Sequence, residues 1–99
     1  MSRETDPELL EAWSLHHNGA NEEAIERFNR ILANRPGNHD ALNGLALSQK
    51  ALGDHLGARV TFKKMIQALE KLIEEDPDKS LRATMEIRMA KQQIEMLDT

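Results

Sequence analysis

The chain repeats itself with a period of 34 residues, and this repeat limits its folds more than any other feature. Six residues recur at that offset, against roughly two expected by chance for such a composition. The identical pairs are Asp6 and Asp40, Ala12 and Ala46, Ser14 and Ser48, Gly19 and Gly53, Ala24 and Ala58, and Phe28 and Phe62. A period of this length indicates a supersecondary unit that buries its apolar face by stacking on a neighbouring unit.

Each unit has the pattern of two helices separated by a turn. In the second half of the first unit, apolar residues recur on one helical face at Ala24, Ile25, Phe28, Ile31 and Leu32. Gly19 is suited to the left-handed backbone conformation that commonly ends a helix, and Asn21 is predicted to cap the next helix. Pro36 ends that helix. The second unit repeats this pattern around a turn at Gly53.

These patterns predict an all-α fold of antiparallel helix hairpins with five helices, over residues 7–18, 22–35, 39–52, 55–75 and 79–97. Asp6-Pro7 and Asp76-Pro77 are predicted as capped helix starts, because proline at the first helical position loses no hydrogen bond. The length allows one core, so residues 1–99 are expected to form one domain. Its parts are a first repeat over 5–38, a second over 39–76 with an extended second helix, and a closing helix over 78–99.

The order of small, glycine, aromatic and proline residues in these units resembles the tetratricopeptide repeat, over about residues 5–72. The residues that carry the resemblance are Ala12, Gly19, Ala24, Phe28 and Pro36 in the first unit, and Ala46, Gly53, Ala58 and Phe62 in the second. Glu8 and Glu11 depart from the family pattern, and the second unit lacks its closing proline. The resemblance implies a short α-solenoid. Two repeats are fewer than such stacks normally need, so the closing helix is expected to be required for folding.

The resemblance also implies a binding site. Members of this family usually hold peptide segments of other proteins on the concave face formed by the first helix of each pair. The corresponding partner-binding residues here are expected to be Leu9, Trp13, His16, His17, Asn43, Leu47 and Lys50. One subclass binds C-terminal carboxylates through Lys and Asn, but Leu9, Trp13 and Gly44 occupy those places, so this specificity is not expected. Trp13 can be read either as a core residue or as a ligand-facing anchor.

The closing helix carries two apolar stripes, whereas a simple cap needs one. The stripe expected to be buried is Ala83, Ile87, Ala90, Ile94 and Leu97. The second stripe is a candidate interface and consists of Leu81, Met85, Met89 and Met96. Methionine-rich surfaces suit adaptable contacts, so this stripe is expected either to wrap into the groove or to pair two copies as a homodimer.

Charge and residue types argue against several other functions. Acidic residues outnumber Lys and Arg by 17 to 13, and this net charge of −4 disfavours nucleic-acid binding. The chain has no cysteine, and adjacent His16 and His17 point about 100° apart on a helix, so neither a metal site nor a cofactor is expected. A nucleophile elbow, a phosphate loop and a zincin signature are all missing from the sequence, so an enzyme is not expected.

The remaining expectations concern location and partner. Residues 1–20 lack a signal-peptide pattern and apolar runs stay well below ~18 residues, which favours a cytoplasmic protein that does not engage membranes. Arg59, Lys63 and Lys64 are expected on a solvated convex face. The favoured function is a non-enzymatic module that binds a protein or peptide segment in the groove. The alternative is a structural module that self-associates through the closing helix.

Overall fold

The structure, a computed structural model, describes residues 6–98. Its α-helices are α1 (Pro7–His17), α2 (Asn21–Asn34), α3 (His39–Ala51), α4 (His55–Glu75) and α5 (Ser80–Leu97), and a 3₁₀ turn, η2 (Pro77–Lys79), precedes α5. The described part of the chain contains five α-helices and no strand, and the structure is 86% helical. The predicted all-α fold with five helices is therefore confirmed, and every helix end agrees to within one residue.

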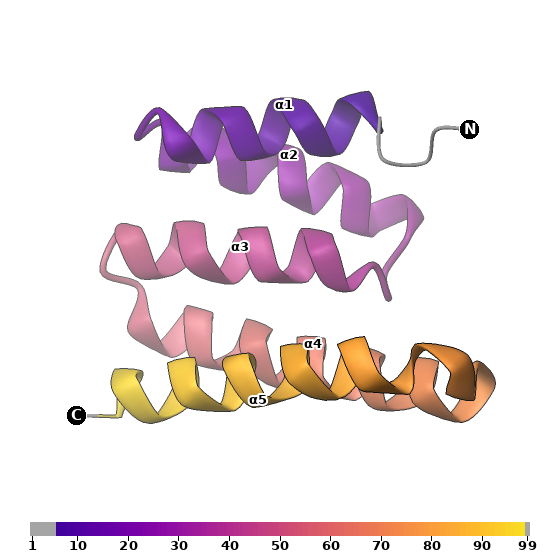
Figure 1. Ribbon diagram of the computed structural model, residues 1–99. Coiled ribbons are helices and arrows are strands. Elements are labelled where there is room, and N and C mark those ends of the chain that lie inside the picture. Colours follow the sequence, from indigo (N-terminus) through magenta and orange to yellow (C-terminus); the bar gives the residue numbers. More distant parts are fainter. Residues whose placement is uncertain (1–5, 99) are drawn as a thin grey trace.

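The helices form two layers in which successive helices run antiparallel (Figure 1). In that view α1, α3 and α5 lie in front and run in the same direction, while α2 and α4 lie behind them. Each helix packs mainly against its neighbours along the chain. The body is flat, with extents of 38 × 35 × 20 Å. One broad side of it, called the front face below, is therefore formed by α1, α3 and α5.

Glycine makes the turn within each of the first two hairpins. Gly19, between α1 and α2, and Gly53, between α3 and α4, both have a φ of 85°, in the left-handed region that other residues rarely adopt. The amide of Gly19 donates to the carbonyl of His16, and that of Gly53 donates to the carbonyl of Lys50, both at 3.0 Å. These bonds satisfy carbonyls that the helix ends leave free, as the glycine spacing predicts.

Of the predicted helix caps, one is confirmed and two are wrong. Asp6 caps α1, since its Oδ1 accepts from the amides of Glu8 and Leu9. Asn21 does not cap α2: it is the first helical residue, and its side chain lies against His16 instead. Asp76 does not cap α5, because η2 intervenes and Asp76 makes no capping bond through its side chain.

The first core cluster lies between α1, α2 and α3. Its buried residues are Ala12, Ala24, Phe28, Ile31, Ala41 and Leu45. The ring of Phe28 is fully buried and lies so close to Gly44 that a Cβ atom at this position would overlap it. Gly44 therefore allows the close approach of α3 to the ring on α2.

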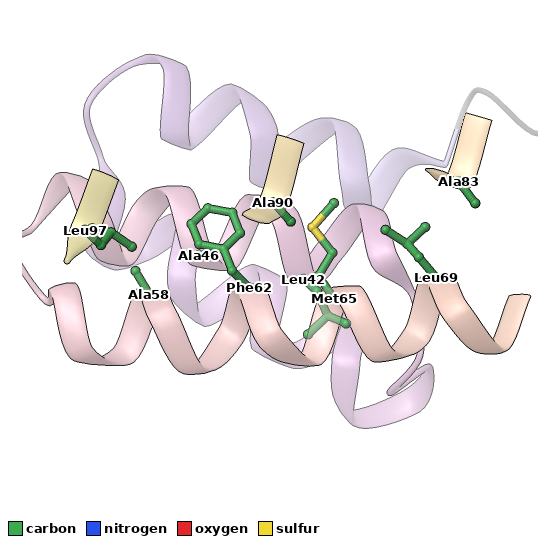
Figure 2. Packing of buried hydrophobic residues seen from close by; sticks show 9 residues of the cluster. All are labelled: Leu42, Ala46, Ala58, Phe62, Met65, Leu69, Ala83, Ala90 and Leu97. Atoms are coloured by element: carbon green, nitrogen blue, oxygen red, sulfur yellow. The ribbon is translucent and has the colours of Figure 1, made fainter. Parts of the chain in front are cut away.

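The second core cluster joins α3, α4 and α5. Its buried residues are Leu42, Ala46, Ala58, Phe62, Met65, Leu69, Ala83, Ala90 and Leu97. Figure 2 shows Leu97, Ala90 and Ala83 of α5 in antiparallel order along the α4 residues of the cluster. Ile87 and Ile94 are partly buried against the same cluster. The stripe of the closing helix that the sequence predicts to be buried is thus the one that packs on α4.

The hairpin of α4 and α5 is longer than the rest of the stack. With 21 residues against 14, α4 is about 10 Å longer than α2. The extra turns carry α4 and the start of α5 beyond the beginning of α3, at the right of Figure 1. This overhang follows from the lack of a closing proline in the second repeat, because nothing ends α4 before Asp76.

Candidate functional site

Trp13 is the largest side chain of the predicted groove, and the structure packs it against the core. Its ring is half-buried and packs edge-on against Phe28, with centroids 5.3 Å apart. The indole Nε1 donates to Asp40 Oδ1 at 3.2 Å, which ties α1 to α3. Trp13 is therefore anchored in the first core cluster while the residue remains partly exposed to solvent.

The two neighbouring histidines have different surroundings. His16 is half-buried, and its Nδ1 lies 2.7 Å from Asn21 Oδ1 and 3.1 Å from the buried Ser48 Oγ. Its ring position is therefore fixed from both α2 and α3. His17 is exposed and stacks on Trp13, with centroids 5.8 Å apart and an interplanar angle of 26°. His16 also lies beside the indole, edge-on with centroids 5.8 Å apart, but of this pair His17 is the more exposed.

The α3 residues of the predicted groove border α5. Asn43 and Leu47 are half-buried and line a small cavity of about 100 Å³ together with Met89 of α5. Buried Phe62 and Met65 of α4 also line it. Leu47 packs against the second core cluster, and this contact holds its side chain in place. The sequence left open whether the stripe that contains Met89 wraps into the groove or pairs two copies, and Met89 here borders the groove residues Asn43 and Leu47.

Two polar bridges connect α3 to α5. Lys50, a predicted groove residue, donates from Nζ to Gln93 Oε1 at 2.8 Å. Nearer the start of α3, His39 Nδ1 lies 3.1 Å from Glu86 Oε1, and Arg82 Nε lies 3.4 Å from the other oxygen of Glu86. The front face is thus continuous from α1 to α5, joined by Trp13 and Asp40 on one side of α3 and by these bridges on the other.

A larger cleft opens beneath the overhang of α4 and α5. Its volume is about 870 Å³, within the range of ligand pockets. It is lined by Leu9, Gly37, Asn38, His39, Asp40, Ala68, Lys71, Leu72, Glu75, Asp78, Lys79, Arg82, Ala83 and Glu86. Leu9 is the only predicted groove residue in this lining, and the sequence analysis missed the cleft. The one sequence signal for the cleft was the length of α4, since the cleft lies where α4 extends beyond the start of α3.

The second stripe of α5 is exposed. The relative accessibility is 76% for Leu81, 57% for Met85, 63% for Met89 and 54% for Met96. The opposite stripe packs on α4, so the helix is apolar on two sides. A second exposed apolar group, which the sequence analysis did not single out, comprises Leu52, Leu56 and Val60 at the turn into α4.

Charged groups around the front face are mostly paired across helices. Arg35 Nη1 donates to Asp6 Oδ2 at 2.8 Å, and this bond, with the amides of Leu9 and Glu8, holds the pKa of Asp6 below its ordinary value.

On α4, the prediction of a solvated face is wrong for Arg59, which is half-buried and pairs with Asp98 at 2.7 Å. Lys63 and Lys64 are exposed, as expected.

Residues 6–98 contain no group of three or more His, Asp or Glu side chains placed to hold a metal ion. Within that same range, every helix is too short or too polar to cross a membrane. Comparisons with models of protein families, with curated proteins and with solved structures give no match. The resemblance to the tetratricopeptide repeat therefore stays a prediction, resting on the quoted residues alone.

Proposed function

We propose that this protein is a non-enzymatic interaction module that binds a segment of another protein on its front face. One observation carries the proposal: the three parallel helices of the front face each carry an exposed or partly exposed large apolar side chain, and these side chains define the proposed binding strip. Trp13, Leu47 and Met89 are its anchors, one from each helix. A partly buried Trp that is fixed by its neighbours is typical of residues that dominate protein interfaces, and an exposed Met adapts its shape to a partner.

The arrangement of the polar groups supports the same proposal. Asp40, Lys50 and Glu86 are held by partners on adjacent helices, so the strip between them needs little reordering when a ligand binds. A surface that is ordered beforehand loses less entropy on binding. The strip also contains Asn43 and His17, whose polar groups can bond to the backbone of an extended peptide. The resemblance to tetratricopeptide repeats, whose first helices hold peptides, agrees with this use.

The proposal can be tested with a displayed library of random peptides of about 16 residues, roughly the length of α5. The library is selected on the wild type and on Leu47→Lys, whose new charge would stand in the middle of the strip. Leu47 also touches the core, so Asn43→Lys provides a second variant at a half-exposed polar position. Circular dichroism and thermal unfolding establish that each variant is folded. We expect both variants to lower peptide recovery by about tenfold or more.

Leu56→Lys is the matched control, because Leu56 is 68% exposed and lies on α4, outside the front layer. It should leave recovery unchanged. Equal recovery on the wild type and on both front-face variants would contradict the proposal. So would a loss of recovery with Leu56→Lys alone.

A further inference from the structure

The methionines of α5 continue the proposed binding strip. Met89 is 63% exposed and lines the small cavity with Asn43 and Leu47 of α3. Met85 precedes it by one helical turn on the same side of α5 and is 57% exposed. A surface patch of large apolar residues that borders a cavity is typical of an interaction site, and methionine adapts its shape to different partners.

The charges beside this pair of methionines are unbalanced. Arg82 and Arg88 lie three residues before and three residues after Met85, so they flank it on both sides of the helix. The Arg82 side chain is 90% exposed, and Arg88 is exposed without an ion-pair partner among the described residues. The one acidic residue between them, Glu86, is only 23% exposed.

Glu86 offsets only one of the two arginine charges, and its carboxylate is turned toward His39 and Arg82 rather than toward Arg88. One oxygen faces His39 of α3 and the other faces Arg82. The contact with Arg82 is 3.4 Å long and joins residues one turn apart, and the Arg82 side chain is 90% exposed, so Arg82 can turn to another carboxylate at little cost. Arg82 and Arg88 are thus two cations placed to meet acidic groups of a partner.

A second copy of this chain fits the same surface less well. A two-fold, antiparallel pair of α5 helices centred on Met85 and Met89 would place the Arg88 side chains of both copies on the same side of the contact. They would lie within about one helical turn of each other, where like charges repel. The surface therefore favours a partner with charges of opposite sign.

We propose that the α5 surface formed by Arg82, Met85, Arg88 and Met89 recognises an amphipathic partner segment whose apolar side chains are flanked by Asp or Glu. This inference rests on the proposed function and specifies the chemistry of its partner. The apolar side chains of the segment lie on Met85 and Met89 and reach toward Leu47, and its carboxylates bond to the two arginines. Charge-assisted bonds of this kind select partners by sign as well as by shape.

The test selects the same random-peptide library on the wild type and on the double variant Arg82→Glu/Arg88→Glu. The wild type should enrich apolar peptides rich in Asp and Glu, and the double variant should lower their recovery by about tenfold or more and enrich basic peptides instead. Lys63→Glu/Lys64→Glu is the matched control, since it makes the same change in net charge on exposed residues of α4. It should still enrich acidic peptides. Met85→Gln/Met89→Gln should lower their recovery to a similar extent without altering charge.

Each outcome separates this inference from the proposed function. If peptide recovery depends on Leu47 or Asn43 but the enriched peptides are neutral or basic, the inference fails and the proposed function stands. The same holds if recovery depends on Leu47 or Asn43 but neither α5 double variant changes it. If recovery depends on none of these residues, both fail. Light scattering on the free protein adds one further outcome. A dimer that Met85→Gln/Met89→Gln converts to monomer would assign the surface to a second copy and overturn the acidic-segment proposal.

Discussion

The two hairpins of the repeat, α1–α2 and α3–α4, share their buried residues but not their surroundings. Ala12 and Ala46, Ala24 and Ala58, and Phe28 and Phe62 are equivalent pairs with at most 1% exposure. The first hairpin has a neighbour on one side only, because α3 follows it and nothing described precedes it. The second hairpin lies between the first hairpin and α5.

Equivalent positions outside this shared core differ for that reason. Ser14 is exposed, whereas the identical Ser48 is fully buried and bonds to His16. Leu10 is 59% exposed, whereas its equivalent, Gly44, lies under the ring of Phe28. The repeat thus specifies how each hairpin packs internally, and the position of a hairpin in the stack decides which of its other residues become buried.

The largest loss of stability is expected at the buried phenylalanine that the two hairpins share. Phe28→Ala and Phe62→Ala should each lower the free energy of unfolding by ~3–5 kcal/mol, because each removes a fully buried ring. Urea unfolding followed by circular dichroism measures both. A loss below ~1 kcal/mol at one site alone would show that the two hairpins are not packed in the same way.

The next pair of substitutions tests an equivalent position that is buried in the second hairpin and exposed in the first. Gly44→Ala should cost ~1–3 kcal/mol, because the added methyl group overlaps the ring of Phe28. This cost runs against the higher helix propensity of alanine, which alone would favour the variant by up to ~1 kcal/mol. Leu10→Ala, at the equivalent exposed position, should change stability by no more than ~0.5 kcal/mol. A stabilised Gly44→Ala protein would mean that α2 and α3 are further apart than described.

A smaller effect is expected at the repeated serine. Ser48→Ala removes a buried hydroxyl group that bonds to His16 and should cost ~0.5–1.5 kcal/mol. Ser14→Ala changes an exposed helical position and should be neutral within ~0.5 kcal/mol. Thermal unfolding of both variants under identical conditions provides the comparison, and equal losses would contradict the difference in burial.

The smallest effect concerns the repeated aspartate and depends on pH. Asp6 pairs with Arg35, and its pKa in the folded protein lies below its ordinary value of 3.8. Its contribution to stability is therefore fully present above the ordinary pKa and is lost as pH falls through the lower, folded value. Asp6→Asn keeps a capping side chain but loses the ion pair, so it should be slightly less stable than the wild type at neutral pH.

The stability difference between Asp6→Asn and the wild type should then shrink as the solution is acidified below pH 3.8. Asp40→Asn is the matched control at the equivalent position, where the carboxylate accepts from the neutral indole of Trp13. Unfolding curves collected from neutral to acidic pH give both series. A difference for Asp6→Asn that grows on acidification would contradict the assigned ion pair.

Most of the fold follows from local signals in the sequence. Helix ends were predicted to within one residue because Gly19, Gly53 and Pro36 stop or turn the chain through their own backbone geometry. The capping prediction for Asn21 was wrong because its side chain has a competing partner, His16, on another helix. Such competition depends on how two helices are aligned, which the apolar period does not specify.

The candidate site is less predictable for the same reason. The resemblance placed Trp13, Asn43 and Leu47 on the first helices of the hairpins, α1 and α3. The structure places these two helices together in the front layer. The sequence could not pair Lys50 with Gln93, and it left open whether the stripe that contains Met89 reaches the groove, because the alignment of α5 against α3 arises from packing on α4. The large cleft likewise depends on the relative placement of three helices.

Chemical-shift mapping with an enriched peptide is the direct test of binding on the front face. We expect the largest changes to centre on Trp13, Asn43, Leu47 and Met89, with the side-chain resonance of the Trp13 indole among them. Leu56, Lys63 and Lys64 on α4 should remain unchanged, because they lie outside that face. Changes concentrated on these α4 residues, with the indole resonance unaffected, would show that the peptide binds outside the front face.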